Sequence, residues 1–168
     1  GDTARLEPAL VGDAVNLASR MEGLSKFFGV RVALSGSTRA ALPDRDVGVG
    51  TLRLLGEVRA KGRTGTTTVY EALDADPADL RARKQAALSR FEAGQQAETA
   101  GDHGSAVKAF TDVLQALPDD VPTRMWLERC AHFLLHGKPG QGHSNRMHDA
   151  TLEALVDTRD GFTGCDSH

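Results

Sequence analysis

The sequence lacks the features that define several classes of protein. No apolar run approaches the ~18 residues that a membrane-spanning helix needs, and no secretory signal peptide is visible. Its 20 basic and 23 acidic residues give a formal net charge of −3, so it has no basic surplus of the kind that nucleic-acid-binding proteins use. We therefore expect a soluble, cytoplasmic chain that does not bind nucleic acid. Its 168 residues are enough for one ordinary domain, or for a small domain with an appendage.

Cysteine is also scarce. Cys130 and Cys165 are far apart in the sequence and have no metal-ligand spacing, so we expect free thiols in a reducing compartment. The chain begins with Gly1 rather than Met, and we expect it to be a fragment of a longer protein.

The most informative stretch is Val-Gly-Asp-Ala-Val-Asn-Leu-Ala-Ser-Arg-Met-Glu at residues 11–22. Asp13 is a good N-cap, and apolar residues then recur every three or four positions, which predicts a helix over Asp13–Phe28 that ends before Gly29. Asn16 and Arg20 are four apart and thus neighbours on its surface. An amide beside a guanidinium suits a polyphosphate or a ribose hydroxyl, although spacing alone favours a solvated polar face.

The next elements are short and mixed. Alternation predicts a strand at Val30–Leu34, and a serine-capped helix follows at Ser35–Leu42, before Pro43. Two β-rich runs, Thr51–Ala60 and Thr66–Ala72, are joined by a Gly-containing turn and predict a hairpin. This order predicts an α+β fold, with helices against one face of a sheet.

The second part of the chain is entirely helical in pattern. Helices are predicted at about 79–99, 105–117 and 122–135, and the Gly-, Ser- and His-rich remainder is expected to be flexible. We therefore divide the chain into a first domain at 1–74, a helical segment at 75–137 and a tail at 138–168.

The helical segment resembles a tetratricopeptide-type helical hairpin. The resemblance lies in the spacing of a few small, aromatic and proline residues, namely Gly94, Gly101, Ala106, Phe110 and Pro118. Ala97 and Val113 are imperfect matches to the same pattern. One such repeat cannot bury its own face, so the third helix is expected to cap it, with Trp126 in the helical core. A purely helical scaffold would need further repeats and is the weakest interpretation.

Gly-Asp-Ala-Val-Asn-Leu-Ala-Ser-Arg-Met-Glu-Gly-Leu, at residues 12–24, resembles the second-half signature of class III adenylate/guanylate cyclase catalytic domains. The resemblance extends to about Ala72. It implies the C-terminal half of a ferredoxin-like cyclase domain that works as a homodimer in intracellular signal transduction. The implied reaction converts ATP, or GTP, to the cyclic nucleotide and diphosphate, and we expect adenylate cyclase activity.

The resemblance implies roles for three residues. Asn16 would hold the ribose or orient the nucleotide, and Arg20 would stabilise charge on the α-phosphate in the transition state. Lys61 matches the hairpin lysine that contacts the terminal phosphates, whereas by itself it would more often be a solvated turn residue.

Two departures from the family pattern affect the expected activity. The family's two metal-binding aspartates, which hold Mg²⁺ or Mn²⁺, belong to the first half of the domain, and Asp13 is a capping residue rather than a ligand. We identify no metal ligand in this chain and expect it to be inactive alone. Ala9 occupies the position where relatives read the purine edge with Asp or Thr, so the choice between ATP and GTP stays open.

These departures support an alternative of another class. The chain would then be a non-catalytic, cyclase-like dimerisation or interaction module whose tetratricopeptide-like tail binds a protein partner. The resemblance further suggests bacterial multidomain cyclases, which are often anchored in the membrane through upstream segments.

Two other groups of residues have simpler interpretations. His132 and His136, with Cys130 nearby, have a spacing that zinc sites use, but ordinary helix residues are favoured because zinc needs three or four convergent ligands. The basic run of Arg81, Arg83 and Lys84 is predicted to be a solvated helix face.

Overall fold

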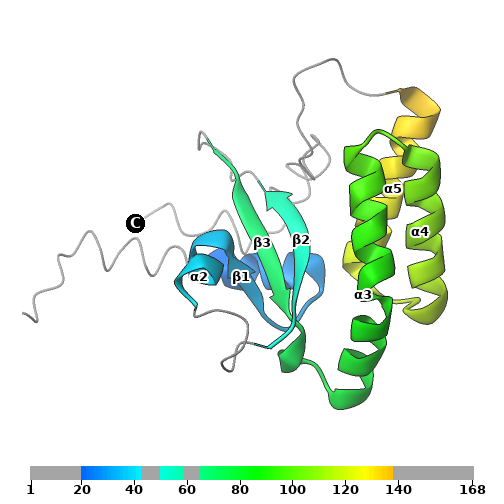
Figure 1. Cartoon of the computed structure of the whole chain (residues 1–168). Helices are drawn as coiled ribbons and strands as arrows, with labels where there is room; N and C mark the ends of the chain where they lie inside the picture. Colours follow the sequence, from blue (N-terminus) through cyan, green and yellow to red (C-terminus); the bar gives the residue numbers. More distant parts are fainter. Residues whose placement is uncertain (1–19, 43–49, 59–64, 138–168) are drawn as a thin grey trace, which may run out of the picture.

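The computed structural model describes residues 20–42, 50–58 and 65–137 (Figure 1). After a helix at residues 20–28, the elements are β1 (Ala33–Ser35), α2 (Gly36–Ala41), β2 (Leu52–Val58), β3 (Thr67–Ala72), a 3₁₀ turn (Leu73–Ala75), α3 (Ala78–Thr99), α4 (His103–Ala116) and α5 (Val121–His136). The prediction of an α+β protein is confirmed, since helices accompany one small antiparallel sheet.

The sheet has the strand order β1-β3-β2, and both neighbouring pairs are antiparallel. The predicted pairing of the two β-rich runs is confirmed, although most of the predicted turn lies outside the described residues. Register between β2 and β3 shifts between Leu54 and Gly56, so Leu55 is the extra residue of a β-bulge. β2 is an edge strand of the described sheet, and α3 lies alongside it in Figure 1.

Helix ends follow local capping chemistry. The first helix ends at Phe28 as predicted, because Gly29 takes a φ of 64° and the Val30 amide donates to the Ser25 carbonyl at 2.9 Å. Its predicted start at Asp13 lies outside the described residues. Ser35 caps α2 by accepting from the Thr38 amide at 3.1 Å, also as predicted.

Two predicted boundaries were displaced. The first strand is Ala33–Ser35 rather than Val30–Leu34, because Val30 still takes part in ending the preceding helix. α4 begins at His103 rather than near Ser105, because Asp102 is its N-cap and accepts from the Ser105 amide at 3.0 Å.

One hydrophobic cluster joins the sheet and the helices. It contains Phe28 of the first helix, Val69 of β3 and Phe110 of α4, none of which has exposed surface. Trp126 of α5 is 4% exposed and stacks on Phe110 with ring centroids 5.9 Å apart, which confirms its predicted place in the helical core. The sheet therefore packs directly against α3–α5, whereas the division into two domains stays a prediction.

None of the helices in the described ranges is long and apolar enough to cross a membrane.

The close approach of α3 and α4 depends on Gly94. A Cβ atom added to Gly94 would lie 2.7 Å from Cε1 of Phe110, whose ring is fully buried. Gly104, near the start of α4, is a matched control, since an added Cβ there would meet nothing nearer than the Asp102 carboxylate oxygen at 3.8 Å.

We expect Gly94→Ala to lower the free energy of unfolding by about 1–3 kcal/mol, because the helices must separate or Phe110 must move. Gly104→Ala should instead be neutral or stabilising by up to about 1 kcal/mol, since alanine is the better helix former. Urea denaturation of the two variants measures both effects. Equal effects of the same sign would contradict the contact.

Candidate functional site: a buried ion cluster and the cyclase-like residues

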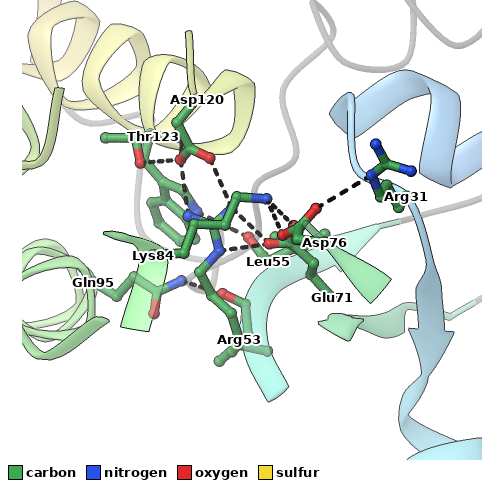
Figure 2. Close-up of polar contacts among 11 residues, drawn as sticks. Arg31, Arg53, Leu55, Glu71, Asp76, Lys84, Gln95, Asp120 and Thr123 are labelled. Atoms are coloured by element: carbon green, nitrogen blue, oxygen red, sulfur yellow. Dashed lines mark hydrogen bonds and ion pairs between the residues drawn. The ribbon is translucent and has the colours of Figure 1, made fainter. Parts of the chain in front are cut away.

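Five charged side chains meet between the sheet and the helices, and we call them the buried ion cluster. Each is at most 8% exposed: Arg53 of β2, Glu71 of β3, Asp76 before α3, Lys84 of α3 and Asp120 before α5 (Figure 2). Burying one such charge without a partner would be very unfavourable, so the geometry of the pairing decides whether the sheet and helices stay together.

Arg53 is the centre of the cluster. Its Nε donates to Glu71 Oε2 at 2.7 Å, and its two terminal nitrogens donate to the two oxygens of Asp120, each at 2.9 Å. Arg53 and Glu71 are directly paired across β2 and β3, and the guanidinium lies 4.9 Å from the ring centroid of Phe91 on α3. The planar guanidinium of Arg53 therefore contacts β2, β3, α3 and the start of α5 at once.

Lys84 makes the second connection. Its Nζ donates to Glu71 and, at 2.7 Å, to Asp76 Oδ2, while the more exposed Arg31 lies 3.8 Å from Asp76 Oδ1. The prediction that the basic run of α3 is a solvated face is wrong for Lys84, which is 6% exposed. It is correct for Arg83, whose side chain is 50% exposed. The two acidic partners of Lys84 come from other elements, which is why a charge run alone did not reveal them.

Asp120 has two structural functions. It binds Arg53, and it is also the N-cap of α5, where Oδ2 accepts from the Thr123 amide at 3.2 Å and from the Thr123 hydroxyl. Burial by itself would raise the pKa of Asp120, but the hydrogen bonds and charge of Arg53 outweigh it and hold that pKa below its usual value. Burial would likewise lower the pKa of Arg53, yet Asp120 and Glu71 keep it above its usual value. All these shifts favour the charged forms.

The bulge of β2 contacts the helices through its carbonyl groups. Gln95 Nε2 of α3 donates to the Leu54 carbonyl at 2.8 Å, and Trp126 Nε1 of α5 donates to the Leu55 carbonyl at 2.9 Å. The edge strand is thus covered by side-chain donors from two helices rather than by another strand.

The buried ion cluster is a structural connection rather than a metal site. Its carboxylates already face Arg53 and Lys84, and the described residues contain no group of three His, Cys, Asp or Glu side chains arranged to hold a metal ion. His132 and His136 have ring centroids 4.6 Å apart on α5, without a third ligand among those same residues. The predicted source of Mg²⁺ or Mn²⁺ ligands, an N-terminal half of the domain, stays a prediction.

Of the residues that the cyclase resemblance singles out, only Arg20 falls in the described ranges. It is helical and partly exposed. Arg20, Leu24 and Phe28 are spaced by four residues and thus lie along one helix face, of which Leu24 and Phe28 are buried in the core. Asn16, Lys61 and Ala9 lie outside the described residues. In chain order, Lys61 belongs to the connection between β2 and β3.

Sequence reasoning missed Arg53, Glu71 and Asp120. One signal was available for Arg53, which is a charged residue inside the leucine-rich run of a predicted strand. Asp120, two residues before Pro122 and at the start of an apolar helix, also fits an N-cap. Neither signal identifies the partner, because Arg53 and Asp120 are far apart along the chain and meet only after the helices pack.

Comparison with known proteins gives three relatives that carry the same name. The chain is 31% identical over 130 residues (77% of the chain) to "Adenylate cyclase, terminal-differentiation specific" of Dictyostelium discoideum. It is 38% identical over 73 residues (44%) to "Adenylate cyclase 1" of Rhizobium meliloti (strain 1021), and 36% identical over 74 residues (42%) to "Adenylate cyclase" of Anabaena cylindrica. The chain is related to adenylate cyclases.

This relationship is partial. The matches cover 6%, 10% and 14% of the three relatives, respectively, so the chain corresponds to a small part of each. Neither a protein-family model nor a solved structure matches the chain.

The match to the Dictyostelium protein includes the helices. A contiguous stretch of 130 residues in a chain of 168 always contains residues 39–130. That range holds β2, β3, α3, α4 and the first part of α5, and with them every member of the buried ion cluster. The similarity therefore extends past residues 1–74, which we call the cyclase-like part, into the helical segment at residues 75–137.

The burial of Lys84 can be tested by comparing substitutions of Lys84 and of its exposed neighbour Arg83. Lys84→Met should lower the free energy of unfolding by about 3–5 kcal/mol, because it removes the buried cation that Glu71 and Asp76 share and leaves one oxygen of each carboxylate without its hydrogen-bond donor. Arg83→Met removes the same charge from the exposed face and should change it by less than about 0.5 kcal/mol. Chemical denaturation at pH 7 compares them, and similar values for the two variants would contradict the burial of Lys84.

Asp120 makes stability dependent on pH. Its pKa is lowered in the folded protein, so its contribution is complete above the unfolded-state value of about 3.9 and is lost as the pH falls through the lower folded-state value. Asp120→Asn should be destabilised at pH 7 and lose less stability than the wild type between pH 5 and 2.5. Asp119→Asn, at a fully exposed neighbour, is the control. Urea denaturation across this range measures the slopes, and parallel curves for Asp120→Asn and wild type would refute the assignment.

Proposed function

We propose that this chain is part of a class III nucleotide cyclase that converts ATP to cyclic AMP and diphosphate in signal transduction. The observation that carries the proposal is the sequence relationship to three proteins named adenylate cyclase. The signature-like run at residues 12–24 supports the assignment to class III. A ferredoxin-like arrangement of the whole domain and a homodimer with shared sites are part of the same proposal.

Arg20 is the proposed catalytic group. In the cyclisation, the ribose 3′-hydroxyl attacks the α-phosphorus in line and diphosphate leaves, so negative charge builds on the α-phosphate oxygens. A guanidinium presents several N–H donors in a fixed plane, which suits that charge. Burial of Leu24 and Phe28 fixes the helix that carries Arg20, while Arg20 itself keeps access to solvent.

Asn16 and Lys61 complete the proposed substrate contacts, with Asn16 at the ribose and Lys61 at the terminal phosphates. Asn16 precedes Arg20 by four residues, which on a continuous helix would place the two side chains on one face. Mg²⁺ or Mn²⁺ is proposed as the cofactor and would stabilise phosphate charge when bound. The described residues offer no ligands for it, so no step of the reaction is assigned to the metal here.

A non-catalytic interaction module is the second candidate. The similarity to the Dictyostelium protein includes the helical segment, and the close approach of α3 and α4 at Gly94 supports the proposed tetratricopeptide-like hairpin. In this proposal the cyclase-like part forms a dimerisation surface and the helical segment binds a protein partner. Ala9, in place of a base-reading polar side chain, favours it over catalysis.

A cyclase assay tests the proposed function. The full-length product of the gene is incubated with ATP or GTP and with Mg²⁺ or Mn²⁺, beside the 168-residue chain. We expect cyclic AMP from the full-length protein and none from the short chain. Arg20→Ala should lower kcat by about 10²–10³-fold, because a preorganised donor to the transition state is lost. Arg20→Lys should recover only part of the rate, since it keeps the charge but not the planar fork.

Arg83→Ala is the control for charge removal, because Arg83 is exposed on α3 and is expected to leave the rate unchanged. A folded, dimeric full-length protein that makes no cyclic nucleotide would refute the enzyme and favour the interaction module. Equal rates for Arg20→Ala and wild type would refute the role of Arg20.

A further inference from the structure

Two histidines lie side by side near the end of α5, the last helix of the described chain (Figure 1). His132 and His136 are about one helical turn apart and both are exposed. Their ring centroids are 4.6 Å apart, and the ring planes are tilted by 44°. In the described part of the chain, no hydrogen bond or ion pair engages either imidazole. The ring nitrogens of both residues are therefore available there to a ligand from solution.

The opposite side of α5 holds this pair in place. Cys130 and Phe133 are at most 7% exposed and pack this part of the helix against the core. The helix continues to His136, and the Gly137 amide then donates to the Phe133 carbonyl at 2.9 Å. A pair of ligands on a packed helix loses mainly side-chain rotation when it binds, because the backbone is already fixed.

The charges around the pair favour a cation. The carboxyl end of a helix is the negative end of its dipole, and His136 lies in the last turn of α5. Glu128, four residues before His132, is exposed on the same face of the helix. Arg129 is instead directed inward, where its side chain is 11% exposed and its Nε donates to Glu98 Oε1 at 3.2 Å. The positive charge of Arg129 is thus already paired.

We propose that His132 and His136 chelate one divalent transition-metal ion of the copper and zinc class. Two histidines four residues apart on one helix face bind such an ion in the helical His-Glu-x-x-His zinc motif. Imidazole nitrogen suits Cu²⁺, Zn²⁺ and Ni²⁺, whereas Mg²⁺ and Ca²⁺ take oxygen ligands. This ion is therefore distinct from the Mg²⁺ or Mn²⁺ of the proposed cyclase reaction, and the inference does not depend on that reaction.

The chelate differs from the closed zinc site that the sequence analysis disfavoured. A closed structural site needs three or four protein ligands, and the described residues contain no such group. Two imidazoles leave positions on the ion that water completes, so the site is open. The bound ion joins the last turn of α5 to the turn before it and stabilises this end of the helix.

Titration of the 168-residue chain with metal chlorides tests the chelate. Calorimetry should show one tightly bound Cu²⁺ or Zn²⁺ per chain, with Cu²⁺ bound more tightly and Mg²⁺ not bound. His132→Ala and His136→Ala should each weaken binding by about 10–100-fold or more, since even changes outside the first ligand shell reach that range. His148→Ala, which removes a histidine outside α5, is the matched control and should leave the affinity unchanged. Circular dichroism checks that each variant is folded, as expected for alanine at exposed helix positions.

A spacing series separates chelation on the helix from the number of histidines. In the His136→Ala background, Glu128→His restores a pair four residues apart and should recover most of the lost affinity. Leu134→His in the same background gives a pair two residues apart, which does not share a face, and should recover none. Absence of binding by the wild type, or an affinity that follows histidine number rather than spacing, would overturn the proposal.

Two further measurements report on the bound ion directly. The electron paramagnetic resonance spectrum of bound Cu²⁺ should show coupling to two imidazole nitrogens in the wild type and to one in His136→Ala. Zn²⁺ should raise the urea midpoint of the wild type but not that of His136→Ala, because an ion that binds the folded pair stabilises the folded chain. Equal spectra, or equal shifts of the midpoint in the two proteins, would contradict the chelate.

Discussion

The arrangement of the described chain depends on the pairing of one buried guanidinium. Arg53 is on the edge strand of the sheet, and its planar fork binds Glu71 on the neighbouring strand and Asp120 at the start of α5. Because Asp120 is also the N-cap of α5, the residue that begins the last helix is the residue that attaches it to the sheet. Neither carboxylate can be lost without leaving a buried charge, so the geometry of the sheet and that of the helices are coupled.

A buried ion pair is weak evidence for stability but good evidence for specificity of packing. Apolar contacts such as those of Phe91, Phe110 and Trp126 supply most of the favourable free energy, and they tolerate small sliding movements. The short, directional bonds of Arg53 and Lys84 do not, because displacement exposes unpaired charge to an apolar interior. We infer that the apolar cluster holds the helices against the sheet while the buried ion cluster fixes their register.

The sequence predicted the local structure well and the connections between elements poorly. Gly29, Ser35 and the helical pattern of residues 79–135 act within a few residues, and the elements that they predict are confirmed apart from small shifts of their ends. Lys84 was misassigned because its partners come from β3 and the loop before α3. The bulge at Leu55 was also missed, since its carbonyl partner Trp126 is distant in sequence. As for the proposed site, Arg20 is the one of its three residues that lies in the described ranges, whereas Asn16 and Lys61 lie outside them.

The relationship to adenylate cyclases bears on why the helices follow the sheet. The match to the Dictyostelium protein covers both, and polar groups of α3 and α5 donate to the backbone of β2 at its bulge. A chain that needed the helices only as a partner-binding appendage would satisfy the edge of β2 more simply, with charged residues or a covering loop. Donors from two helices instead bind consecutive carbonyls of β2, so the helices and the sheet form one connected structure in the described residues.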